Sequence, residues 1–283
     1  MKALAWLFGF CSLWPACLAA DRIVTLGGSV TETVFALGAG DLVAARDMSS
    51  VYPEAATQLP DVGYFRTIGA EGVLAQKPTL ILAAHGVGPE PQVTLLRNSG
   101  IRFVLVEAKP SAESTADMIR EIGALVHKEK EAAELIAHLH TRFAEAGRLA
   151  QTAAKPPKAV VLMGAGAGVL QAAYDDTAAS ALVALAGGSN PFTGYIGYKT
   201  TNAEELFVAD PDFIFIASRD GQAVGEKFGT PKHPPEWLLT TRAARNGHLL
   251  TFDMAYYLVF GPRIGDAVAT LAHTLHAPAP AAR

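Results

Sequence analysis

Short apolar runs of strand length alternate with amphipathic segments along most of the chain. The apolar runs lie at 23–26, 42–45, 79–84, 102–107, 159–163, 213–217 and 248–252. Apolar positions at helical spacing fall between several of them, at 91–99, 177–185 and 264–276. Strands that alternate with helices in this way predict an α/β fold with mostly parallel sheets.

The segment 112–154 has a different pattern. It contains no strand-like run and no proline, and its apolar residues recur at helical spacing on both sides of a charged patch at 127–131. This pattern indicates two helices or one interrupted helix. The sequence therefore predicts two similar α/β lobes, at 21–111 and 155–283, joined by a helical connector, with the ligand cleft between the lobes.

Two stretches of the chain resemble each other. One contains Tyr64, Arg66 and Glu71, and the other contains Tyr198 and Glu204. In both, Gly-Tyr and a basic residue precede Ala-Glu at the start of a predicted helix, a proline follows the glutamate by seven residues, and a strand comes next. This shared order indicates weak internal symmetry between the two lobes.

The first twenty residues have the three-part composition of an export signal. Lys2 precedes an uncharged apolar run, and small residues lead to Ala20, where we expect cleavage. Both cysteines, Cys11 and Cys17, lie in this segment, so the mature chain is expected to contain neither a disulfide nor a thiolate metal site. Removal of Lys2 leaves 22 basic residues against 27 acidic ones, a formal net charge of −5, which argues against nucleic acid as a partner.

Four blocks of sequence carry a family resemblance: VGYFRTIGAEGVLAQKPTLIL, TAASALVALAGGSNPF, GYKTTNAEELFVADPDFIFIA and FGPR. They resemble the periplasmic haem-binding proteins of bacterial haem uptake systems, which are substrate-binding proteins of ABC importers with a rigid linking helix. The most specific stretch is Gly-Tyr-x-Arg-x-x-x-Ala-Glu-Gly, which separates haem carriers from siderophore- and cobalamin-binding relatives.

The resemblance implies a periplasmic protein that binds ferric haem b without catalysing a reaction. It would deliver the haem to an ABC permease in the inner membrane, with an outer-membrane haem receptor system upstream, and its lobes would move little on binding. A carrier for another iron chelate or for cobalamin is the nearest alternative. An exported haem-modifying enzyme is a further one, for which the sequence offers no acid/base apparatus.

Within this resemblance, Tyr64 is the axial ligand of ferric haem. A phenolate is a hard anionic oxygen donor that suits Fe(III). The phenol of a free tyrosine titrates near pH 10, so the iron and a nearby cation must favour its ionised form. Arg66 is the candidate for that cation, or it pairs with a haem propionate. From residue types alone, an ordinary surface loop is the better interpretation of both side chains, and it is the family motif that favours the haem ligand.

Further candidates follow strands or belong to the repeated stretch. His85 and Arg219 each come after a predicted strand, and ligands of α/β sheets lie beyond the carboxyl ends of strands. We expect Arg219 to face Tyr64 or a propionate across the cleft. His85 either contacts haem, is a second iron ligand, or has no role. Tyr198 and Lys199 are the counterparts of the Tyr64 region and are expected to line the opposite wall.

The loop 164–168 consists of glycine and alanine. Some haem carriers of the family have an additional histidine in this loop, and its absence here argues against a second haem or a bis-ligated iron held in that way. The glycines of this loop also raise the alternative that it is a phosphate-binding turn. The loop does not fit G-x-G-x-x-G, however, and no suitably placed acid ends the next strand.

Glu71 and Glu204 each fall in the first turn of a predicted helix, where the helix dipole stabilises an acid. The resemblance adds a second role, because in this class one glutamate per lobe pairs with arginines of the permease. Glu32 competes with Glu71 for this role in the first lobe. Ser29 and Glu32 also fit a capping box that opens the helix after the first strand.

Overall fold

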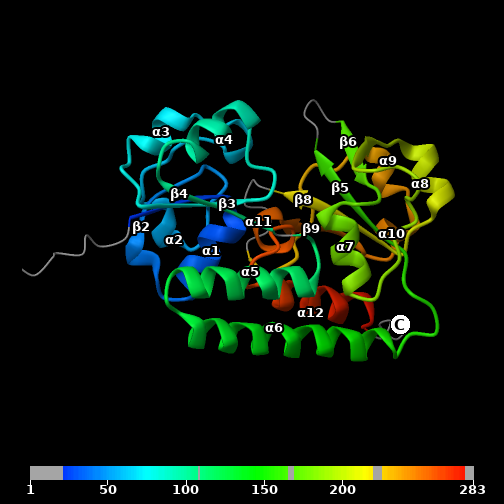
Figure 1. Cartoon of the computed structure of the whole chain (residues 1–283). Coiled ribbons are helices and arrows are strands. Elements are labelled where there is room, and N and C mark those ends of the chain that lie inside the picture. Colours follow the sequence, from blue (N-terminus) through cyan, green and yellow to red (C-terminus); the bar gives the residue numbers. More distant parts are fainter. Residues whose placement is uncertain (1–21, 108, 165–168, 219–224, 278–283) are drawn as a thin grey trace, which may run out of the picture.

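Two β-sheets, each covered by helices, form two lobes above a pair of long helices (Figure 1). The computed structural model describes residues 22–107, 109–164, 169–218 and 225–277. The predicted export signal at 1–20 lies outside these residues. The prediction of a two-lobed α/β fold with mostly parallel sheets is confirmed. No helix within the described ranges is long and apolar enough to cross a membrane.

The sheet of the first lobe is parallel throughout, in the order β2-β1-β3-β4. Its two central strands are fully buried, as expected when helices cover both faces of a parallel sheet. The strands are β1 (Ile23–Leu26), β2 (Val43–Arg46), β3 (Leu80–Ala84) and β4 (Arg102–Val106). The helices and 3-10 turns are α1 (Gly28–Ala36), η1 (Gly40–Leu42), α2 (Glu54–Thr57), η2 (Phe65–Thr67), α3 (Ala70–Leu74) and α4 (Glu90–Arg97).

The sheet of the second lobe is mixed, in the order β7-β6-β5-β8-β9. β5, β8 and β9 run parallel, whereas β6 and β7 are antiparallel additions that the sequence pattern did not predict. The strands are β5 (Ala159–Gly164), β6 (Leu170–Ala173), β7 (Tyr198–Thr200), β8 (Phe213–Ser218) and β9 (Leu249–Asp253). The helices are α7 (Ala178–Leu185), α8 (Ala203–Ala209), α9 (Glu236–Leu239), α10 (Arg242–Arg245), α11 (Met254–Tyr257) and α12 (Ile264–Leu275).

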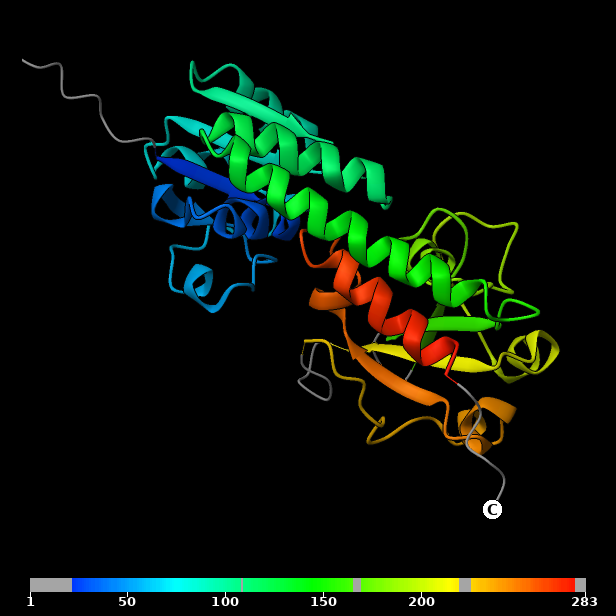
Figure 2. The same ribbon diagram turned by 90° about the horizontal axis from the view of Figure 1, so that it is seen from below.

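The connector consists of two helices, α5 (Ala112–Leu125) and α6 (Glu129–Ala150). They pack closely where Gly123 faces Ala132, because a Cβ at Gly123 would come within 2.6 Å of the Ala132 Cβ. α5 packs against α1 of the first lobe, whereas α6 runs beneath both lobes beside α12 (Figure 2). With 22 residues, α6 is about 33 Å long, so one helix spans the molecule.

Charged side chains reinforce the contact between α6 and α12. Asp266 accepts a hydrogen bond from Arg142 Nε at 2.7 Å and lies 3.1 Å from His138 Nε2. Glu145 lies 2.8 Å from His273 Nε2, and this hydrogen bond holds the pKa of the Glu145 carboxyl below its usual value. The α6–α12 pair is therefore held by ionic contacts at its margins as well as by apolar packing.

One continuous hydrophobic core joins the two lobes. It includes Leu82 of β3, Met118 of α5, Leu139 of α6, Phe215 of β8 and Leu271 of α12, all of them fully buried. A second, smaller cluster lies within the second lobe alone. The lobes and the connector are therefore parts of one packed unit.

The internal symmetry predicted from the sequence extends to the backbone. Gly63 and Gly197, which precede the two tyrosines, have φ angles of +98° and +97°, a region that favours glycine. Lys77 and Asp210, each followed by proline, also have positive φ. The strand orders β1-β3-β4 and β5-β8-β9 match as well. The two stretches therefore occupy equivalent positions in the two lobes.

The start of α1 differs from the expected capping box. Ser29 lies inside the helix, the N-cap is Gly27, and no side chain caps the helix N-terminus. Gly27 has a φ of +115°, and a Cβ there would come within 2.5 Å of the Ala84 Cβ. Glu32 is engaged elsewhere, with Arg263. The capping-box prediction is therefore wrong, because close packing against β3 determines where α1 begins.

Candidate ligand-binding cleft

A cavity of about 910 Å³ lies between the two lobes. In the first lobe it is lined by the segments that follow β1, β2 and β3, and in the second lobe mainly by the segment that follows β9. These are carboxyl ends of parallel strands, where ligands of α/β sheets bind. The volume falls within the range of about 300–1,000 Å³ that is typical of small-molecule sites.

Tyr64, the residue that the sequence suggests as the iron ligand, lies half-buried in the wall of this cavity. Its ring meets the Phe65 ring edge-on at a centroid distance of 5.3 Å. The preceding residue is fixed on both sides, since Gly63 donates to Asp61 Oδ1 at 2.8 Å and accepts from the Met48 N–H at 2.9 Å. Among the described residues, the Tyr64 hydroxyl has no hydrogen-bond partner. The ring is therefore held in place while its oxygen remains available to a ligand.

Arg66 lines the same wall. Its guanidinium lies over the Phe65 ring, 4.8 Å from the ring centroid. A Cβ at Gly86 would come within 2.5 Å of Arg66 Nη1, so glycine at this position leaves room for the side chain. No carboxylate of the described residues pairs with the guanidinium. Arg66 therefore presents an uncompensated positive charge beside Tyr64, suited to an anionic group of a ligand.

His85 and Tyr198 also line the cavity, from opposite lobes. His85 is exposed, and its Nδ1 lies 3.4 Å from Glu107 Oε1, so a ligand must share this imidazole with a neighbouring carboxylate. Burial raises the pKa of the Tyr198 phenol. Tyr198 therefore stays protonated near neutral pH and offers a hydrogen-bond donor opposite Tyr64.

Lys199 does not line the cavity. Successive side chains of a strand point to opposite faces, so Lys199 points away from the side on which Tyr198 meets the cavity. Lys199 Nζ lies 3.4 Å from Glu205 Oε1 and 5.8 Å from the centroid of the Tyr174 ring. The expectation that Lys199 lines the wall is therefore not met. Arg219 lies outside the described residues.

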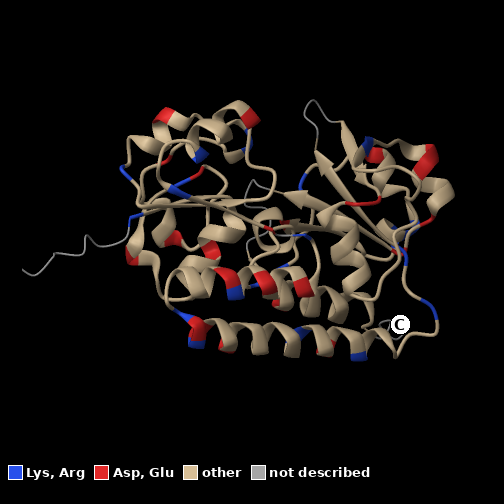
Figure 3. Ribbon diagram, in the orientation of Figure 1, with Lys and Arg blue, Asp and Glu red and all other residues tan. Residues whose placement is uncertain are grey.

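Glu71 and Glu204 are exposed in the first turns of α3 and α8. Both helices lie at the outer parts of the lobes, on the side away from α5 and α6, and both carry acidic residues (Figure 3). Helical spacing places Phe207 and Val208 on the same face of α8 as Glu204, and these apolar residues are 83% and 78% exposed. Glu32, the competitor of Glu71, is only 4% exposed and paired with Arg263, so it is not a surface group.

The sequence interpretation missed part of the lining. The segment from Asp253 to Phe260 borders the cavity, and Asp253 caps α11 by accepting the Ala255 N–H at 2.8 Å. Met48 and Met163 also line the cavity, and their flexible thioethers adapt well to a flat apolar surface. The signal was present in the sequence, because an apolar run follows the carboxyl end of the last predicted strand.

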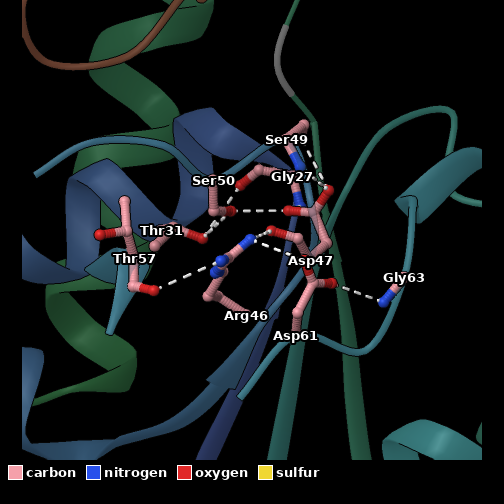
Figure 4. A network of polar contacts seen from close by, with 9 residues as sticks. All are labelled: Gly27, Thr31, Arg46, Asp47, Ser49, Ser50, Thr57, Asp61 and Gly63. Atoms are coloured by element: carbon pink, nitrogen blue, oxygen red, sulfur yellow. Dashed lines mark hydrogen bonds and ion pairs between the residues drawn. The ribbon is translucent and has the colours of Figure 1, made fainter. Parts of the chain in front are cut away.

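A buried hydrogen-bond network around Asp47 holds residues that line the cavity (Figure 4). The Asp47 side chain is fully buried and accepts four hydrogen bonds, from the Gly27 N–H at 2.8 Å, the Ser49 N–H and hydroxyl at 2.9 and 2.6 Å, and the Ser50 hydroxyl at 2.6 Å. Gly27 and Ser49 both line the cavity. One carboxylate therefore fixes the loops after β1 and β2 relative to each other.

Comparison with known proteins agrees with this architecture. The family model described as "Periplasmic binding protein" matches residues 23–256. The vitamin B12-binding protein of Photorhabdus laumondii subsp. laumondii is 28% identical over 202 residues, which cover 71% of this chain and 72% of the relative. The periplasmic heme-binding protein RhuT from Roseiflexus sp. RS-1, solved in apo form, is 31% identical with a TM-score of 0.81, covering 91% of this chain and 98% of that one.

A periplasmic heme-binding protein from Pseudomonas aeruginosa is similar to the same extent. It is 30% identical with a TM-score of 0.79, covering 92% of this chain and 94% of that one. Both solved relatives thus align over nearly their whole length, and the family model spans both sheets and the connector. The chain belongs to the periplasmic binding protein family.

Proposed function

We propose that this periplasmic binding protein captures ferric haem b through Tyr64 and delivers it to an ABC permease of the inner membrane. One observation carries the proposal: Tyr64 and Arg66 lie in the same wall of the cavity between the lobes, and among the described residues neither the Tyr64 hydroxyl nor the Arg66 guanidinium has a polar partner. Phenolate oxygen is a hard donor for Fe(III), and the Arg66 guanidinium in the same wall supplies a positive charge to pair with an anionic oxygen. Two solved relatives of 30–31% identity are haem-binding proteins, which supports the same ligand class.

The other cavity residues fit secondary roles. Arg66 either favours the phenolate or pairs with a propionate. Tyr198 donates a hydrogen bond from the opposite wall, and His85 contacts the ligand at its edge, where Glu107 already holds one ring nitrogen. Methionines and the segment after β9 provide apolar contact with the macrocycle. Arg219, outside the described residues, is proposed as a further partner of a propionate. Binding requires no chemical turnover in this arrangement.

Delivery to the permease would use Glu71 and Glu204, one on each lobe. Both are exposed on helices on the side away from the connector, so a membrane partner could reach both at once. The apolar neighbours Phe207 and Val208 would add contact area beside Glu204, since exposed apolar patches mark interaction surfaces. Permease arginines would supply the matching charge.

A carrier for cobalamin or another iron chelate is the second candidate. It is favoured by the curated relatives of 28–29% identity, which are vitamin B12-binding proteins. Cobalamin already carries its own axial ligands and needs no phenolate from the protein. The two candidates therefore differ in whether Tyr64 contributes an iron bond.

The deciding experiment is a titration of the mature protein with ferric haem, and separately with cobalamin, followed by absorption spectroscopy. The variant Tyr64→Phe keeps the ring packing on Phe65 and removes only the oxygen. Tyr195→Phe is the matched control, because Tyr195 is 48% exposed and does not line the cavity. We expect saturable haem binding with a high-spin phenolate spectrum that Tyr64→Phe abolishes and Tyr195→Phe retains.

Two outcomes would redirect the assignment. Saturable binding of cobalamin without saturable haem binding would establish the second candidate. Haem binding with the same spectrum in Tyr64→Phe would keep the ligand but remove Tyr64 from the iron, and His85→Ala would then be the next variant to titrate.

A further inference from the structure

A buried ion pair joins the two lobes at one edge of the cavity. Glu32 of α1 accepts hydrogen bonds from Arg263 Nε at 2.9 Å and from Arg263 Nη2 at 2.7 Å, and its Oε1 also lies 3.3 Å from the Arg263 backbone nitrogen. The Glu32 side chain is 4% exposed and the Arg263 side chain 20%. This fork-to-carboxylate geometry fixes both the distance and the mutual orientation of the two groups.

Aromatic rings from both lobes enclose the same guanidinium. Arg263 lies 3.5 Å from the centroid of the Tyr52 ring in the first lobe and 5.0 Å from that of Tyr256 in the second. Gly261 permits the approach, because a Cβ there would come within 3.2 Å of Glu32 Oε1. The pair is therefore packed on several sides and partly shielded from salt, unlike the exposed ion pairs of the surface.

Residues close to the pair along the chain line both walls of the cavity. Ser29 lies one helical turn before Glu32, Val51 is adjacent to Tyr52, and Phe260 lies three residues before Arg263. Ser29, Val51 and Phe260 all line the cavity. A displacement of Arg263 relative to Glu32 would therefore change the separation of the walls that meet the ligand.

We propose that Glu32 and Arg263 are a positioning pair that sets the width of the cleft before any ligand binds. The helices α5 and α6 and the common hydrophobic core already join the lobes beneath the sheets. Apolar packing is non-directional, so it does not by itself fix the distance across the cleft where a ligand would lie. The Glu32–Arg263 pair adds a directional connection between α1 and the start of α12, and this connection keeps the cleft at one width. This role goes beyond the proposed function, because it is independent of which ligand the cleft holds.

The test measures the distance between the lobes by pulsed electron–electron resonance with nitroxide labels. The mature chain is expected to be free of cysteine, so Asn98→Cys at the end of α4 and Ala184→Cys on α7 provide one exposed label in each lobe. Glu32→Gln is introduced into this labelled protein, and so is the double variant Glu32→Gln/Arg263→Met, which leaves no unpaired charge buried. Circular dichroism establishes that each variant is folded.

Arg242→Lys is the matched control, because Arg242 makes the same kind of two-pronged contact, with Asp210 and Asp212 at 2.9 and 2.8 Å, but within the second lobe only. Without ligand, we expect one narrow distance distribution for the parent and for Arg242→Lys. We expect a broadened or shifted distribution for both variants of the pair. Parent-like distributions in the folded double variant would overturn the proposal.

A second readout uses ferric haem as the probe and rests on the proposed function. The haem dissociation rate is expected to rise at least tenfold in the double variant, while the phenolate spectrum stays unchanged because Tyr64 is untouched. An unchanged rate would also contradict the proposal. A parent protein that binds no haem would refute the haem assignment alone, since the distance measurement needs no ligand.

Discussion

The loss of the Asp47 carboxylate should destabilise the protein far more than the loss of an exposed carboxylate from the same region. Asp47→Ala removes the acceptor of four hydrogen bonds. The Ser50 hydroxyl keeps a contact with Thr31 Oγ1 at 2.6 Å, and the Ser49 hydroxyl is partly exposed and can reach solvent. The N–H groups of Gly27 and Ser49 lose their partner.

The magnitude follows from these two amides. A buried donor without a partner costs about 1–3 kcal/mol, and hydrogen bonds to a charged acceptor are at the strong end of the usual range. The Gly27 N–H is buried and incurs the full cost, whereas the Ser49 N–H is only partly buried. We expect Asp47→Ala to lower the free energy of unfolding by about 3–5 kcal/mol.

Asp61→Ala is the matched control. Asp61 also accepts a backbone N–H, from Gly63, and pairs with Arg46 at 3.0 Å, but its side chain is 40% exposed. Water can replace this exposed carboxylate, so we expect Asp61→Ala to lower the free energy of unfolding by less than about 1 kcal/mol. Urea unfolding followed by circular dichroism measures both variants, and the m-value shows whether the compactness of either end state has changed.

The reasoning would be refuted by a loss below about 1 kcal/mol for Asp47→Ala, or by equal losses for Asp47→Ala and Asp61→Ala. Trp237 adds a local readout, because it is the only tryptophan after the predicted export signal. Its fluorescence reports on the second lobe, while Asp47 lies in the first. Coincident fluorescence and dichroism transitions are expected, because one core joins the lobes.

Three further predictions concern other parts of the molecule. Glu71→Lys and Glu204→Lys should each abolish ligand delivery to permease-containing proteoliposomes while leaving ligand affinity unchanged, because both residues lie outside the cavity lining. Gly63→Ala should cost roughly 1–2 kcal/mol in urea unfolding, because its φ of +98° disfavours a Cβ, whereas Gly69→Ala, at a φ of −98°, should be nearly neutral. Burial raises the pKa of Tyr256 to about 12, whereas the phenol of an unfolded chain titrates near pH 10. Between about pH 10 and pH 12 the unfolded chain therefore loses this proton while the folded protein keeps it, so the free energy of unfolding falls as pH rises. Tyr256→Phe should reduce the slope of that fall by up to about 1.4 kcal/mol per pH unit.

Each of these predictions has a clear contrary result. Normal delivery by both charge-reversed variants would remove α3 and α8 from the docking surface. Equal costs for Gly63→Ala and Gly69→Ala would show that the backbone before Tyr64 is not under conformational constraint. An alkaline unfolding curve that keeps its slope in Tyr256→Phe would show that another group governs that pH range.

Strands whose own residues form a clear apolar run were predictable from the sequence. Ile23–Leu26 and Phe213–Ser218 are apolar runs buried on both faces, and they were recognised to within one residue. β6 and β7 were missed because they are short and are held by antiparallel pairing with β5 and with each other. Such a strand depends on its partner more than on its own residues.

The residues of the site also divide into those that a local sequence pattern predicts and those whose position depends on tertiary packing. Tyr64 and Tyr198 were placed in the cleft because the repeated Gly-Tyr signal is local. Lys199 was misplaced because adjacent strand residues face opposite sides, so one residue decides which face is reached. The contact between Glu32 and Arg263 joins residues 231 positions apart, and no local pattern links them. It depends on how the lobes pack.

That separation has a consequence for the order of folding. At about 5–20 residues per second, synthesis of the chain between Glu32 and Arg263 takes roughly 10–50 s. During this interval the first lobe lacks Arg263, the partner of the Glu32 carboxylate that the native state buries. It also lacks the apolar face of α12, which completes the common core. The growing chain is therefore expected to stay incompletely packed until its last helix arrives, which keeps it available to chaperones until synthesis is almost finished.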